Sequence, residues 1–120
     1  MTLVEFLEAR LTEDELMASA AIDGDAEWHV LYAYRDIKDV DGHYVVLADG
    51  EYPTFGQAAH IARHNPARVL RQCEAARFVI AEFLRLEAIG DPSGSRVAEV
   101  ALKQLASVHS DHVDFDQAWL

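Results

Sequence analysis

The first twenty residues place leucines at helical spacing, which predicts an N-terminal helix over residues 2–21. Thr2 and Glu5 have the spacing of a capping box at its start. Thr12 and Glu15 repeat that spacing, which leaves open a break into two shorter helices. Because the apolar pattern continues past this point, one long helix is favoured.

In the next segment apolar residues recur at every second position, as in a β-strand. Residues 28–35 alternate and place Trp28, Tyr32 and Tyr34 on one face. A second strand is predicted over residues 43–47, directly after an Asp-Gly pair typical of hairpin turns. Its pairing partner is either residues 37–40, which precede the turn, or the first strand itself. Either choice gives a small antiparallel meander of two or three strands.

Three further helices are predicted before an acidic tail over residues 109–120. Asn65 suits a helix N-cap and Pro66 the first helical position, so two consecutive helices meet there. The predicted helices cover residues 54–64, 66–89 and 95–108, the last after a linker at 90–94. The predicted buried stripe of the last helix is Val97, Val100, Ala101, Leu105 and Val108. The expected fold is therefore α+β, a single domain of residues 1–120, with the tail packed on it or extending from it.

Composition and charge exclude several classes of protein. Hydrophobic residues make up 51% of the chain and charged residues 26%, which is typical of a globular protein rather than a disordered one. Ten basic residues against 21 acidic ones give a net charge of -11, which argues against binding to nucleic acid or to an anionic membrane. Cys73 is the only cysteine, so no internal disulfide forms and a cytoplasmic location is expected.

The charge is unevenly distributed, because residues 57–88 carry five arginines and only three acids. Most of these arginines are expected to pair with acidic residues of the same chain. The aromatic strand face is expected to pack on the helices; if it lies outside, it is a docking surface for a protein partner. The candidate interaction residues are Trp28, Tyr32, Tyr34, Arg68 and Arg71.

Two histidines at helical spacing are the main candidates for chemistry. His60 and His64 stand four residues apart, so both lie on one helix face and together they can bind one metal ion, zinc above all. The further candidate ligands are in the tail: His112 first, then His109, Asp111 and Asp114. The favoured alternative is a polar cluster of His60, His64 and His112 that ties the tail to the helix junction. No residue pattern indicates a catalytic nucleophile, so an enzyme is not favoured.

Residues 58–71, which contain the run His-Ile-Ala-Arg-His-Asn-Pro-Ala-Arg-Val-Leu-Arg, resemble a family of small uncharacterised proteins of actinobacteria and their phages. The resemblance extends back through residues 42–46 and the first helix. It extends forward to residues 111–115, where Val113 and Phe115 replace a proline and a tyrosine of the family pattern. The family has no assigned activity. The resemblance implies a cytoplasmic accessory protein encoded by a bacterium or a phage.

The sequence thus favours a non-enzymatic protein that acts by protein–protein interaction, such as a phage or prophage factor that binds a host protein. The alternative is a zinc-binding protein, hydrolytic or regulated by metal, that uses His60, His64 and His112. The helix over residues 66–89 is apolar on more than one side, which also predicts a homodimer.

Overall fold

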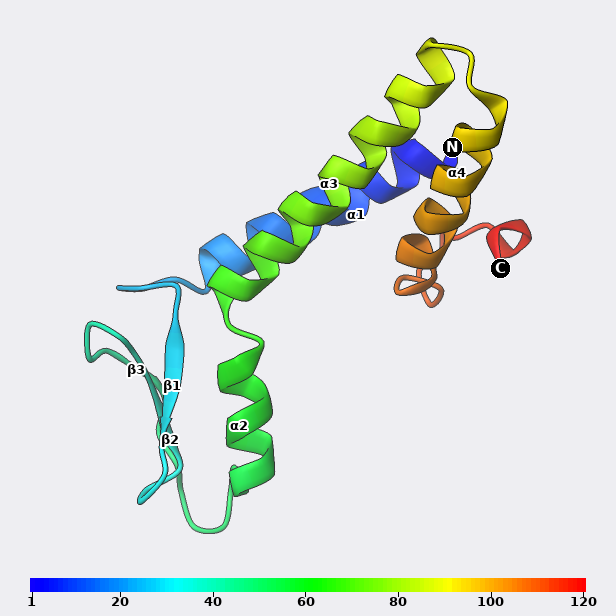
Figure 1. Ribbon diagram of the computed structural model, residues 1–120. Helices are drawn as coiled ribbons and strands as arrows, with labels where there is room; N and C mark the ends of the chain where they lie inside the picture. Colours follow the sequence, from blue (N-terminus) through cyan, green and yellow to red (C-terminus); the bar gives the residue numbers. More distant parts are fainter. The chain divides into compact units, whose positions relative to one another are not determined.

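The computed structural model describes all of residues 1–120 and has the predicted α+β architecture (Figure 1). An N-terminal helix precedes a three-stranded antiparallel sheet, and three more α-helices follow. The elements are α1 Leu3–Ala20, β1 Trp28–Leu31, β2 Asp36–Asp39, β3 Tyr44–Val46, α2 Phe55–Arg63, α3 Pro66–Ala88, α4 Pro92–Ser107 and the short 3₁₀ helix η1 Gln117–Trp119. None of these helices is long and apolar enough to cross a lipid bilayer.

The chain divides into two compact units. Unit 1 comprises residues 1–14 and 72–120, and unit 2 comprises residues 15–71. Unit 1 is helical, whereas unit 2 contains the sheet and α2.

Reciprocal capping bonds open both α1 and α2, and those of α1 join the predicted pair Thr2 and Glu5. In α1 the Glu5 N–H donates to Thr2 Oγ1 and the Thr2 N–H donates to Glu5 Oε2, both over 3.1 Å. In α2 the Gln57 N–H donates to Thr54 Oγ1 over 3.2 Å and the Thr54 N–H donates to Gln57 Oε1 over 2.9 Å. Each box pairs two N–H groups at the first turn. Because α1 continues unbroken to Ala20, the single long helix is confirmed.

One side chain ends α2 and begins α3. Asn65 Oδ1 accepts a hydrogen bond of 2.9 Å from the Arg68 N–H, which caps the first turn of α3 as predicted. Asn65 Nδ2 donates to the Ala62 carbonyl oxygen over 3.1 Å, which pairs an acceptor at the end of α2. An amide can make both bonds, whereas a carboxylate can make only the first.

Asn65→Ala is expected to lower the free energy of unfolding by about 1 kcal/mol, because the first turn of α3 loses its cap. Asn65→Asp keeps the cap but loses the bond to Ala62, so its stability should fall between those of Asn65→Ala and the wild type. Urea unfolding of the three proteins measures the order. Equal stability of Asn65→Ala and the wild type would contradict the role of this cap.

The sheet of unit 2 has the strand order β1-β2-β3, so the second predicted strand pairs with residues 36–39 and not with the first strand. β1 is shorter than predicted, because the chain reverses after Leu31. The Tyr34 and Arg35 N–H groups donate to the Leu31 carbonyl oxygen over 3.0 and 2.7 Å, and Arg35 has a φ of 61°. Tyr32 and Tyr34 therefore lie in a turn, and both are about 70% exposed. The expectation that they pack on the helices beside Trp28 is wrong.

The core of unit 2 forms where α2 lies alongside the sheet (Figure 1). Ile37 of β2 and Ala58 of α2 are completely buried, and Ala62 is nearly so. The partly buried residues packed against them are Trp28, Val30, Val45, Val46 and Ile61. Small side chains on α2 bring the helix close to the sheet.

A buried carboxylate organises the turn between β2 and β3. Asp39 is 1% exposed; its Oδ1 accepts from the His43 N–H over 2.9 Å and its Oδ2 from the Asp25 N–H over 3.0 Å. Burial opposes ionisation, but these two hydrogen bonds and the nearby His43 ring outweigh it, so the pKa of Asp39 lies below its ordinary value. A Cβ at Gly24 would lie 2.6 Å from Asp39 Oδ2 and closer still to His43 Nδ1, so only glycine fits there.

In unit 1, α3 and α4 form an antiparallel helical hairpin (Figure 1). The second helix, α4, begins at Pro92, three residues before the predicted start at residue 95. Asp91 accepts from the Gly94 N–H over 2.9 Å and caps α4, with Pro92 in the first turn. The predicted stripe of α4 is wrong, because the buried residues are Leu102 and Ala106. Val97, Val100 and Val108 of that stripe are instead 60–75% exposed. The core comprises Phe6, Leu7, Leu11, Cys73, Ala76, Ile80, Leu102, Ala106 and Phe115.

Candidate functional site

A cleft of about 640 Å³ lies between β1 and α2 in unit 2, and we call it the β1–α2 cleft. It brings together predicted residues of two kinds: the aromatic residues Trp28 and Tyr32, and the histidines His60 and His64. The complete lining is Trp28, His29, Val30, Tyr32, Ala59, His60, Ala62, Arg63, His64 and Asn65. Its size is that of an ordinary ligand-binding site.

His60 and His64 lie side by side, as their spacing predicts. Their ring centroids are 4.4 Å apart and their planes are inclined by 43°. Partial desolvation lowers the pKa of His64, and the positive charges of His60, Arg68 and Arg63 lower it further. The His64 ring therefore gives up its proton at a lower pH than an ordinary histidine.

The lining of the β1–α2 cleft contains no carboxylate, although the chain as a whole carries a net charge of -11. Arg63 supplies a permanent positive charge, and His29, His60 and His64 supply imidazole groups. The cleft is thus suited to an anionic group in contact with aromatic side chains. Of these residues, His29 and Arg63 were not among the predicted candidates. Arg63 lies three residues after His60 on the same helix, a spacing that would have indicated it.

One wall of the cleft is an unpaired sheet edge. β1 has a neighbour on one side only, which is β2. The Val40 N–H donates to the Glu27 carbonyl oxygen, and hydrogen-bonded pairs alternate along an antiparallel ladder. Trp28 and Val30 therefore direct their backbone N–H and C=O groups away from β2. Both residues line the cleft.

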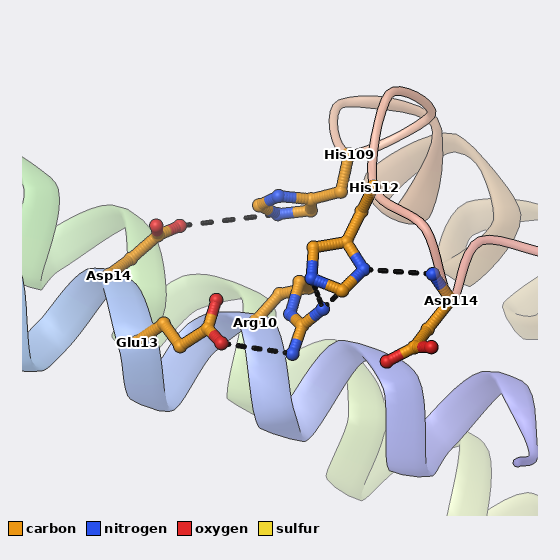
Figure 2. Close-up of polar contacts among 6 residues, drawn as sticks. All are labelled: Arg10, Glu13, Asp14, His109, His112 and Asp114. Atoms are coloured by element: carbon orange, nitrogen blue, oxygen red, sulfur yellow. Dashed lines mark hydrogen bonds and ion pairs between the residues drawn. The ribbon is translucent and has the colours of Figure 1, made fainter.

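The tail histidines contact α1 in unit 1 (Figure 2). Arg10 is buried, and its Nη1 donates to the His112 ring, with Nδ1 at 2.6 Å. His112 Nδ1 also accepts from the Asp114 N–H over 3.0 Å. His109 Nε2 lies 4.0 Å from an Asp14 carboxylate oxygen. The tail histidines thus hold residues 109–114 on α1.

Neither unit gathers three or more His, Cys, Asp or Glu side chains in a metal-binding arrangement. His60 and His64 belong to unit 2, whereas His109, Asp111, His112 and Asp114 belong to unit 1. The pair on α2 alone offers two imidazole ligands. Among the other candidates, Arg68 is half-buried and Arg71 and Tyr34 are exposed, and none of the three lines the cleft.

Comparison with known proteins places the chain in a family without assigning it an activity. Neither the curated proteins nor the solved structures contain a match. A family model with the description "Family of unknown function (DUF6221)" matches residues 1–120. Since the match covers the whole chain, the protein belongs to this family of unknown function.

Proposed function

We propose that the protein is a non-catalytic binding protein whose β1–α2 cleft takes an extended, acidic segment of a partner protein. The observation that carries this proposal is a lining with Arg63, three histidines, two aromatic residues and no acid. Such a cleft attracts carboxylates, whereas the remaining surface of this acidic chain repels them. The partner's acidic side chains would pair with Arg63, which lines the cleft together with Trp28.

The unpaired edge of β1 supports an extended partner rather than a helical one. A peptide strand beside β1 would pair with the outward backbone groups of Trp28 and Val30. Its alternate side chains would then point toward α2, where His60, Arg63 and His64 lie. Backbone bonds would supply affinity that is independent of sequence, and the α2 side chains would select for acidic residues. Because the chain resembles a family expected in actinobacteria and their phages, a host protein is the class of partner that we propose.

A short peptide in which glutamate alternates with valine provides the test. In a titration followed by ¹⁵N NMR, we expect amide shifts confined to residues 28–32 and 59–65. Arg63→Glu should weaken binding about tenfold or more, equivalent to about 1.4 kcal/mol or more. Added salt should weaken binding by wild-type protein, because the contacts are partly exposed ion pairs.

Arg96→Glu is the matched control, because Arg96 is an exposed arginine of unit 1 and should not affect binding. A peptide with lysine in place of glutamate should not shift the same amides. Equal shifts with both peptides, or no shifts at millimolar glutamate peptide, would contradict the proposal.

Zinc binding at His60 and His64 remains the alternative function. It is supported by the 4.4 Å separation of the two rings, one in the last turn of α2 and the other at its C-cap. Protein purified without a histidine tag distinguishes the two functions. If zinc is the ligand, the protein retains about one zinc per chain that His64→Ala loses, and a chelator lowers the Tm. The acidic-segment proposal expects no change in Tm with the chelator.

A further inference from the structure

An apolar groove of about 430 Å³ runs between α3 and α4 in unit 1, and we call it the α3–α4 groove. It has no connection with the β1–α2 cleft, whose lining belongs entirely to unit 2. The lining of the groove is Phe78, Val79, Glu82, Leu86, Gly94, Val97, Ala98 and Ala101. Glu82, its one charged residue, is paired with Arg85 through hydrogen bonds of 2.5 and 3.1 Å.

Large apolar side chains stand beside the groove without a partner in the chain. Phe78 is 72% exposed and Val97 is 73% exposed, although both side chains line the groove. Val100 follows on α4 and is 60% exposed. Contiguous apolar surface of this kind is typical of an interaction site. This face therefore combines an apolar groove with exposed apolar side chains, which can enter the same groove of another copy.

The charges around the groove identify a second copy of the chain as the occupant. Residues 72–107 contain five acidic and four basic residues, whereas the whole chain has 21 acids and ten bases. At the groove itself the acidic Glu82 is paired with the basic Arg85 on α3, whereas Glu99 and Lys103 lie on the side of α4 away from the lining residues. In a two-fold dimer the same patch must face itself, which a balanced patch permits and a uniformly acidic patch opposes.

We propose that two copies of the chain associate through their α3–α4 grooves. Phe78 and Val97 of each copy would insert into the groove of the other, so that both faces are covered at once. Glu82 and Arg85 of one copy would then pair with Arg85 and Glu82 of the other.

Light scattering coupled to gel filtration gives the mass of the particle in solution. We expect the wild type to approach twice the 13.4 kDa of one chain at high concentration. Val97→Glu places a charge in the interface and should weaken the dimer at least tenfold. Phe78→Ser should weaken it as well, by removing the protruding ring.

Val108→Glu is the matched control, because Val108 is 75% exposed, lies next to α4 and does not line the groove. Its mass should equal that of the wild type, and circular dichroism should show that all variants are folded. A wild type that remains monomeric at millimolar concentration overturns the proposal and leaves the groove to a different protein. A dimer that tolerates both Val97→Glu and Phe78→Ser overturns it too.

Discussion

Replacing Phe6 by alanine is expected to lower the free energy of unfolding by about 3–5 kcal/mol, the range for deleting a buried aromatic ring. Phe6 is completely buried in unit 1. Its ring centroid lies 5.1 Å from that of Trp119, 5.8 Å from Phe115 and 5.8 Å from His112. These contacts join the first turns of α1 to the last turns of the tail. Alanine would leave a cavity and also release the tail.

Urea unfolding measures the effect, and Phe78→Ala provides a control with the same residue type at a 72% exposed position. Phe78→Ala should cost well below about 1 kcal/mol in a dilute, monomeric sample. Truncation after Val108 removes the partners of Phe6, so adding Phe6→Ala to the truncated chain should cost less than in the full chain. Equal costs in the two chains would show that Phe6 does not anchor the tail.

Replacing Asp39 by alanine should destabilise unit 2 more than any other change in its turns. The substitution leaves the N–H groups of Asp25 and His43 without their acceptor and empties a buried site. Asp41→Ala is the matched control, because Asp41 is an exposed aspartate of the same turn. We expect a large fall in Tm for Asp39→Ala and little change for Asp41→Ala. Similar Tm values for the two variants would contradict the role of the buried carboxylate.

The same carboxylate predicts how stability depends on pH. The pKa of Asp39 in the folded chain lies below the ordinary value of 3.8. Its stabilising contribution is therefore complete above that value and is lost as the pH falls through the lower, folded pKa. Asp39→Ala should flatten the acid limb of a plot of Tm against pH. An acid limb that is unchanged in the variant would show that other groups determine it.

Local signals predicted the helices well, because a cap and its helix lie within a few residues of each other. The capping boxes at Thr2 and Thr54 and the junction at Asn65 are each recognisable from a short segment. The start of α4 has the same signature, an N-cap at Asp91 followed by Pro92, but the flanking glycines favoured a linker. Alternation predicted too long a first strand, since a period of two carries no signal for the turn that ends it.

The buried face of α4 and the surroundings of the two histidines depend on tertiary contacts, which the sequence pattern does not predict. On α4 the buried positions are Leu102 and Ala106, a face displaced from the predicted one, because the partner of a helix cannot be read from its own periodicity. The α2 histidine pair was predictable from spacing alone. Its position beside Trp28 and Tyr32 depends on how α2 packs on the sheet, which joins residues 28 to 36 positions apart in the sequence.

The close approach of Asp39 and His43 to Gly24 links the residues that these three positions can hold. A side chain at position 24 would overlap the Asp39 carboxylate and the His43 ring, so a larger residue there requires these two side chains to move or to be replaced. Within the family, a larger residue at position 24 is compatible only with a rebuilt turn at positions 39–43. A residue other than glycine at position 24 therefore reports, from sequence alone, that a relative has rebuilt this turn.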